Sequence, residues 1–136
     1  MGFQTTEYLA SAFVDLYLHL YEPPDDIMKR QDQILQKLKI PAAIGMRHAV
    51  PHFAHVFSGS GYASGYYSYM WSEVMEADAF SAFTEVNDPF DSRVAKSLEK
   101  NILAAGGSEE PEILYVNFRG RLPDPNALIE SRGLYT

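Results

Sequence analysis

Apolar residues recur at helical spacing along most of the chain, whereas the alternation typical of β-strands is scarce. The first apolar stripe predicts a helix from a cap at Thr5 or Thr6 to about residue 20, formed by Leu9, Phe13, Leu16 and Leu20. Further apolar side chains widen this set around the helix: Tyr8, Val14, Tyr17 and Leu18. A helix that is apolar on nearly all sides usually lies inside a larger protein, which suggests that the chain is part of one.

The remaining pattern predicts further helices, separated by proline and glycine. A second helix is expected over residues 25–38, with its inward positions at Ile27, Ile34, Leu35 and Leu38. Residues 41–61 predict loop and short helix, and a long helix follows from about Gly61 to Val86. The last helices are expected over about 92–104, over 108–118 with a Ser108 cap, and over 124–133 with an Asp124 cap. The expected fold class is all-α, an array of about five to six helices compatible with one packed unit.

The most informative segment runs from residue 55 to residue 71 and reads HVFSGSGYASGYYSYMW. If it is helical from Tyr62, then Tyr62, Tyr66 and Tyr69 share one face, beside a Gly/Ser loop and His55. One interpretation is an aromatic core stripe. Against it, a buried phenol needs a hydrogen-bond partner, and no packing argument requires the loop. The other interpretation is a row of hydrogen-bond donors directed at a ligand.

The glycines of this segment allow two interpretations. Gly59 and Gly61 would let the loop adopt positive φ values and move over a ligand, or they mark an ordinary loop-to-helix junction. Gly65 is expected inside the long helix, where a close neighbour or a ligand would explain it. Glu73 falls on the same predicted helical face, and we expect it to orient a tyrosine hydroxyl as a buried acceptor rather than to act in catalysis.

Composition excludes several classes of protein. The 136 residues carry a net charge of −7, which disfavours a nucleic-acid partner, and the absence of cysteine excludes disulfides and thiolate metal sites. No apolar run is long enough for a membrane span and no signal sequence is evident, so a cytoplasmic protein is expected. His48, His52 and His55 approach metal-site spacing, but Pro51 interrupts them, and we expect no metal to be bound by this chain alone.

The stretch FAHVFSGSGYASGYYSYMWSEVMEADAF resembles the C-terminal region of the thimet oligopeptidase family of zinc metallopeptidases, whose pattern is roughly F-x-H-x-F-x-G-G-Y-x-x-G-Y-Y-x-Y-x-W. The later stretch AGGSEEPEILYVNFRGRLPDPNALIESRGL is similar to the family's terminal motifs, and QTTEYLASAFVDLYLH to its preceding helix. The likeness covers essentially the whole chain. The segment from Ile102 to Arg119 and the tail look closer to the bacterial peptidyl-dipeptidases than to the animal oligopeptidases.

The resemblance implies a helical enzyme that hydrolyses short peptides with a zinc ion held upstream by H-E-x-x-H. Residues 1–136 would then be the C-terminal, substrate-binding portion of the catalytic domain, inactive alone and partnered by the missing zinc-binding part. It also implies that His55, Tyr62 and Tyr69 are catalytic and that Tyr66, with Gly59 and Gly61, binds substrate. Here Tyr62 follows His55 at a longer spacing than in the family pattern, and Ser60 interrupts the glycine pair.

Two other functions remain open from the residues alone. The chain would serve equally as a non-catalytic helical module that binds peptides or partner helices through the Tyr62, Tyr66 and Tyr69 face. It could also be a small structural or oligomerisation domain with a tyrosine-rich core. A fragment that exposes surfaces made to pack on a missing part is expected to self-associate.

Overall fold

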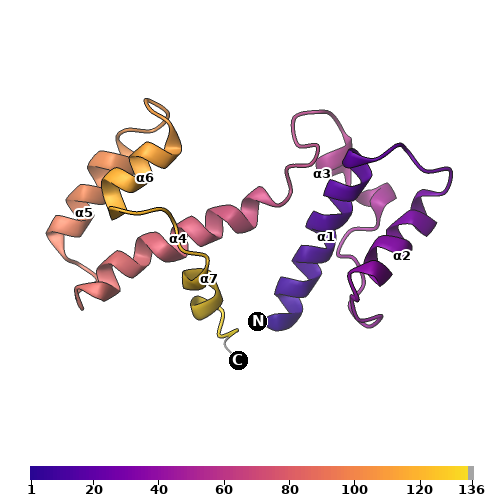
Figure 1. Ribbon diagram of the computed structural model, residues 1–136, viewed down its shortest axis with the longest axis horizontal. Helices are drawn as coiled ribbons and strands as arrows, with labels where there is room; N and C mark the ends of the chain where they lie inside the picture. Colours follow the sequence, from indigo (N-terminus) through magenta and orange to yellow (C-terminus); the bar gives the residue numbers. More distant parts are fainter. Residues whose placement is uncertain (135–136) are drawn as a thin grey trace. The chain divides into compact units, whose positions relative to one another are not determined.

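A computed structural model describes residues 1–134 of the chain, and every regular element in that range is helical (Figure 1). The α-helices are α1 (Gly2–Leu20), α2 (Ile27–Lys37), α3 (Ala54–Phe57), α4 (Ser68–Glu85), α5 (Ser92–Leu98), α6 (Pro111–Arg119) and α7 (Asn126–Ser131). A 3₁₀-helix, η1 (Val50–His52), precedes α3, and a π-helix, η2 (Glu99–Leu103), continues α5. The expected all-α fold class is confirmed.

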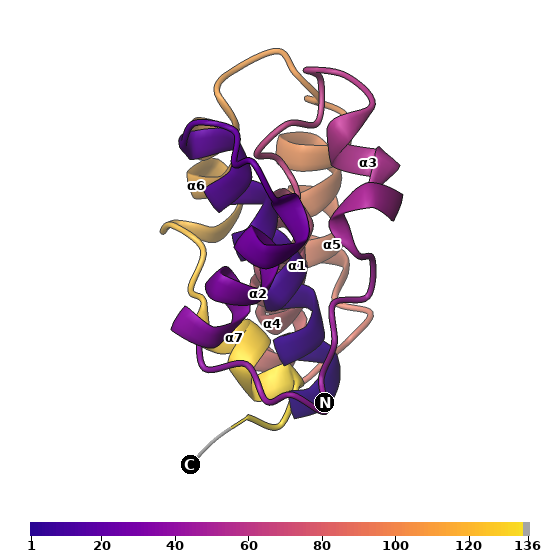
Figure 2. The ribbon, with the colours of Figure 1, turned by 90° about the vertical axis from the view of Figure 1, so that its right-hand side faces the viewer.

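The chain forms two compact units rather than the one that the pattern suggested, Met1–Met70 and Trp71–Thr136. In the first unit α1 and α2 lie side by side (Figures 1 and 2). Their core is the buried cluster of Val14, Ile34 and Val50. Gln31 is also buried there, and its side-chain oxygen accepts a 3.0 Å hydrogen bond from the Val50 N–H, which joins α2 to η1.

Helix α1 buries a different face from the predicted one. Phe13 and Leu20 of the expected stripe are exposed, whereas the buried residues are Ala10, Ser11, Ala12, Val14 and Asp15. Apolar side chains surround this helix, so the spacing alone could not decide which face packs inward. The helix also begins at Gly2, earlier than the predicted Thr5 or Thr6 cap.

Helix α2 lies where the second helix was expected, and the Asp26 carboxylate caps it by accepting a 2.9 Å hydrogen bond from the Lys29 N–H. Ile34 is buried as predicted, but Ile27 is 37% exposed. The long helix differs more. Helix α4 begins at Ser68, not near Gly61, and residues 58–67 form turns instead.

Helix boundaries in the second unit follow local chemistry. The Asp91 carboxylate caps α5 by accepting from the N–H groups of Arg93 and Val94, and Gly120 ends α6 with a left-handed φ of 74°. Ser108 does not cap α6, which begins at Pro111, while Asp124 accepts from the Asn126 N–H at the start of α7. None of the helices within residues 1–134 is long and apolar enough to cross a membrane.

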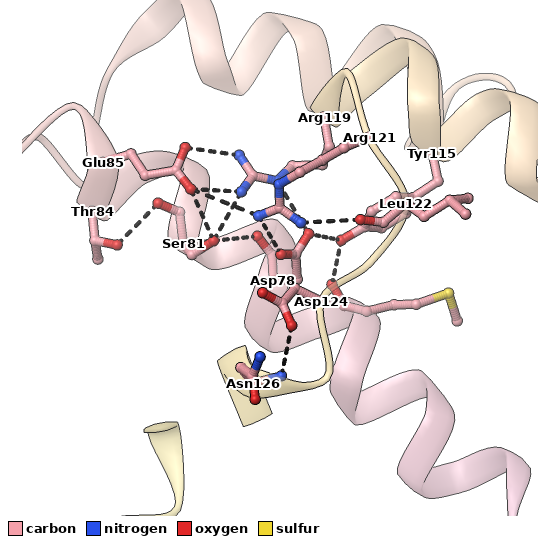
Figure 3. Close-up of polar contacts among 11 residues, drawn as sticks. Asp78, Ser81, Thr84, Glu85, Tyr115, Arg119, Arg121, Leu122, Asp124 and Asn126 are labelled. Carbon is pink, nitrogen blue, oxygen red and sulfur yellow. Dashed lines mark hydrogen bonds and ion pairs between the residues drawn. The ribbon is translucent and has the colours of Figure 1, made fainter. Parts of the chain in front are cut away.

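A buried polar network joins α4 to the end of α6 (Figure 3). Asp78 is fully buried, and its carboxylate accepts from Tyr115 Oη at 2.7 Å, Arg119 Nε at 3.2 Å and Arg121 Nη2 at 2.6 Å. Arg119 also binds the Glu85 carboxylate, at 2.7 Å. Burial alone would raise the pKa of Asp78, but the bonds from Tyr115, Arg121 and Arg119 outweigh it and lower that pKa. This network links α4 to α6 and to the segment that follows it.

Candidate active site

The structure brings His55 together with Tyr62, Tyr66 and Tyr69, and these four side chains are called the aromatic cluster below. The ring centroid of His55 lies 4.9 Å from that of Tyr62, 5.8 Å from that of Tyr66 and 5.7 Å from that of Tyr69. His55 is on α3, Tyr69 is in the first turn of α4, and the other two tyrosines are in the turns between these helices. The predicted set of residues therefore gathers around the histidine.

The tyrosines of the aromatic cluster do not share a helical face as predicted, because Tyr62 and Tyr66 are not on a helix. The Gly65 N–H donates to the Tyr62 carbonyl at 3.0 Å, and Ser64 adopts a left-handed φ of 59°. These turns replace the expected helical face. The tyrosines converge because the backbone folds back on itself, and their spacing of i, i+4 and i+7 is not the cause.

Gly65 has the close neighbour that was expected, although it lies in a turn and not in a helix. A Cβ atom there would stand 3.1 Å from the carbonyl oxygen of Tyr62. Gly59 and Gly61 differ, since a Cβ atom on either would meet nothing within 4 Å, and neither has a φ in the left-handed range. The expected positive φ falls on Ser64 instead.

The ring of Tyr66 is held on several sides. It stacks on Tyr8 at a centroid distance of 5.2 Å and meets Phe53 edge-on at 4.9 Å and Tyr69 at 5.5 Å. The Tyr8 hydroxyl also donates to the Tyr66 carbonyl and accepts from the Met70 N–H at 3.2 Å. Tyr66 is therefore fixed by α1, whereas Tyr62 and Tyr69 are 61% and 46% exposed and can meet a ligand.

Asp15 of α1 holds the turn beneath the aromatic cluster. Its side chain is fully buried, and its two oxygens accept hydrogen bonds from the Ser64 N–H at 3.0 Å and the Tyr66 N–H at 2.9 Å. His19, one turn along α1, lies 2.8 Å from the same carboxylate and stacks on Phe57. The turn that carries two of the cluster's tyrosines is thus bound to a carboxylate far away in the sequence.

The sequence model of peptidase family M3 matches residues 1–134. The chain belongs to peptidase family M3. This confirms the resemblance, which the thimet oligopeptidase-type motifs indicated.

Three relatives illustrate the match to family M3. Oligopeptidase A of Escherichia coli is 42% identical over 123 residues, covering 88% of this chain and 18% of that protein. Probable cytosolic oligopeptidase A of Arabidopsis thaliana is 36% identical over 139 residues, covering 98% and 20%. Dipeptidyl carboxypeptidase of E. coli is 31% identical over 138 residues, also covering 98% and 20%. The chain spans about a fifth of the length of these M3 relatives.

Zinc is the metal that the M3 resemblance implies, and the described residues do not fit it. Within residues 1–134, no group of three or more histidine or acidic side chains is placed to hold a metal ion. His48 stacks on Phe53, and Nε2 of His55 is engaged by Tyr69 at 2.9 Å. The polar groups that the aromatic cluster itself presents are phenols and an imidazole.

The expectation for Glu73 is wrong, and two residues that hold the site were not predicted. Glu73 does not serve as a buried acceptor for a tyrosine, because its partly exposed carboxylate pairs with Arg132, whose side chain adjoins α7. Asp15, which does hold the tyrosine segment, was not among the predicted site residues, and neither was Tyr8. The sequence signal that could have indicated Asp15 is a carboxylate with apolar residues on both sides of it in the helix.

Proposed function

We propose that this chain is the substrate-binding portion of a zinc-dependent M3 peptidase that hydrolyses short peptides, as an oligopeptidase or a peptidyl-dipeptidase. In this proposal Tyr62, Tyr69 and His55 act in catalysis, and Tyr66, with Gly59 and Gly61, binds substrate. The observation that carries the proposal is the aromatic cluster itself. An imidazole and three phenols converge in the segment whose motif matches the family, and two of the phenols are exposed.

The chemistry of the cluster suits a peptide substrate. A peptide carbonyl is a hydrogen-bond acceptor, and its oxygen gains negative charge when the carbon is attacked. A phenol that donates to this oxygen stabilises the charged state more than the ground state, which lowers the barrier. Removing one donor of this kind typically lowers kcat by about 10²–10³-fold. The net charge of −7 is consistent with a peptide rather than a nucleic-acid substrate.

The proposal also requires a partner for the exposed apolar side chains of both units. Leu20 is 70% exposed, Leu103 70% and Phe90 88%. The M3 relatives are about five times longer than this chain, as the covered share of 18–20% implies. We propose that these side chains pack on the zinc-binding part that such a protein contains, and that the chain alone is inactive. A cytoplasmic location belongs to the proposal too, in keeping with the name of the cytosolic relative.

A chimera tests the proposal directly. This chain would replace the matching segment of E. coli oligopeptidase A, with which it shares 42% identity. The chimera should cleave a fluorogenic short peptide, and changing Tyr62, Tyr66 and Tyr69 together to Phe should abolish cleavage.

The matched control is Tyr67→Phe, which removes another exposed phenol of the same segment. It should leave the rate close to that of the unmodified chimera. An active chimera whose triple variant keeps full activity would contradict the proposal. Peptide binding by a folded, zinc-loaded chimera that never cleaves would favour the non-catalytic module instead.

A further inference from the structure

The Asp15 carboxylate is an anchor for the aromatic cluster. Three donors surround it, namely the N–H groups of Ser64 and Tyr66 and the Nδ1 atom of His19. The side chain is fully buried, and these hydrogen bonds replace the water that would otherwise solvate its oxygens. The two backbone donors bind different oxygens, which fixes the peptide plane between Gly65 and Tyr66 as well as the Ser64 N–H.

A carboxylate is the side chain that this geometry requires. Each of its oxygens accepts one of the two backbone N–H groups, and both oxygens are acceptors. An asparagine of the same shape presents one oxygen and one NH₂ group, so one of the two N–H donors would face another donor. Replacing Asp15 by Asn therefore breaks one backbone contact without changing the volume of the side chain.

Tyr8 extends the same anchor from two turns earlier on α1. Its hydroxyl donates to the Tyr66 carbonyl and accepts from the Met70 N–H, and its ring stacks on that of Tyr66. Side chains of α1 thus bind both the N–H and the C=O of Tyr66. They hold the turn at its Tyr66 end, whereas the positions of Gly59 and Gly61 border open space.

We infer that Asp15 and Tyr8 are positioning residues, which act on substrate through Tyr66 by setting where its phenol stands relative to His55 and Tyr69. The inference rests on the proposed function of the cluster. It assigns to α1 a part in substrate binding that the sequence pattern did not indicate. Because neither residue needs to touch the substrate, their effects should appear mainly as altered substrate binding through Tyr66.

The test uses the active chimera with Asp15→Asn and, as a second variant, Tyr8→Phe, which removes the hydroxyl and keeps the ring stack. We expect Asp15→Asn to raise KM by about tenfold, the equivalent of one lost hydrogen bond to a charged group, with a smaller change in kcat. Hydrogen exchange of the 62–67 segment should become faster. The double variant Asp15→Asn/Tyr66→Phe should lose less than the product of the single effects, because both changes act on one group.

Ser11→Ala is the control, since Ser11 is also buried on α1 but its hydroxyl bonds within the helix, to the Glu7 carbonyl. It should change neither KM nor the exchange of the segment. Unchanged exchange in both Asp15→Asn and Tyr8→Phe would overturn the anchor itself. Faster exchange with unaltered KM, in a chimera where Tyr66→Phe does raise KM, would overturn the positioning role. If no cluster tyrosine affects hydrolysis while Asp15→Asn still accelerates exchange, the anchor stands and the proposed function fails.

Discussion

The hydroxyl of Tyr69 and the Nε2 atom of His55 lie 2.9 Å apart. The direction of this hydrogen bond decides what Tyr69 can do. If Nε2 carries a proton and donates to Tyr69, the phenol proton is left for a substrate oxygen. If Nε2 is unprotonated, the phenol donates to His55 and its proton is no longer offered to the substrate. In the proposed site, the tautomer of His55 would therefore decide whether the Tyr69 hydroxyl has its proton available for a substrate oxygen.

The first prediction concerns the individual tyrosines in an active chimera. If Tyr69 or Tyr62 donates mainly to the charged oxygen, its Phe variant should lower kcat by about 10²–10³-fold with little change in KM. Tyr66 is held between Tyr8 and Phe53, so Tyr66→Phe should affect KM at least as much as kcat. Steady-state kinetics on one short peptide separates these effects. Full activity in both Tyr62→Phe and Tyr69→Phe would mean that the cluster serves only for packing.

A second prediction separates loop mobility from loop structure. A Cβ atom at Gly61 meets nothing within 4 Å, so Gly61→Ala should fold normally and only stiffen the loop, which should lower kcat and raise KM together. Gly65→Ala places its Cβ 3.1 Å from the Tyr62 carbonyl and should also lower the melting temperature. Thermal melts beside the kinetics distinguish the two variants. Kinetics of Gly61→Ala equal to those of the parent would exclude loop movement as a limiting step.

The sequence predicted the helical class, the place of the second helix and the residues that gather in the cluster, because these depend on local chemistry. It did not predict the turns at residues 58–67. Asp15 binds Ser64 and Tyr66 across about fifty residues of sequence, and such a contact leaves no periodic signal. A local pattern of tyrosines at i, i+4 and i+7 therefore predicted a helix where a distant carboxylate stabilises a turn.

The buried face of α1 could not be predicted from the sequence either, in this case because it depends on packing. Large apolar residues such as Phe13 and Leu20 favoured one stripe, but the buried face carries Ala10, Val14 and Asp15. A helix with apolar residues all around offers several faces of similar hydrophobicity. Which of them packs inward depends on the partners, here α2 and the turn bound by Asp15, and their positions are fixed only in the folded chain.

The third prediction is that the isolated chain binds no stoichiometric zinc. The motivation is chemical, since Pro51 interrupts the three histidines and His48 packs against Phe53. Metal analysis after dialysis against zinc-containing buffer should give well under one zinc per chain. One tightly held ion that disappears on replacing His48, His52 or His55 would contradict this expectation.

A fourth prediction is that the isolated chain self-associates. Large exposed side chains such as Phe90 and Leu103 leave apolar area in contact with water, which favours association. Light scattering at increasing concentration should show oligomers, and replacing Phe90 and Leu103 by Gln should shift the population toward monomer. A monomer at all concentrations, with a cooperative melt above about 65 °C, would count against it.

The last prediction concerns the acid stability of the second unit, where Asp78 and Glu85 bind Arg119. The bond from Arg119 lowers the pKa of Glu85, and the bonds to Asp78 lower its pKa despite burial. Both carboxylates are thus harder to protonate in the folded state than in the unfolded state. Their contribution to stability is full above the unfolded pKa values, about 4, and should be lost progressively as the pH falls from there through the lower folded-state pKa values.

Two variants test the acid-stability prediction by urea unfolding between pH 7 and pH 3. Asp78→Asn removes one of the two carboxylates that pair with Arg119, whose side chain is only 5% exposed. It should destabilise the unit at pH 7 by less than the about 3–5 kcal/mol of a fully broken buried ion pair, because the exposed Glu85 remains as a partner. Its stability should also depend less on pH. Arg93→Ala, which breaks the exposed pair with Asp91, is the control and should change little. A parent chain as stable at pH 3 as at pH 7 would contradict the assignment, because the ion pairs could then contribute nothing that protonation removes.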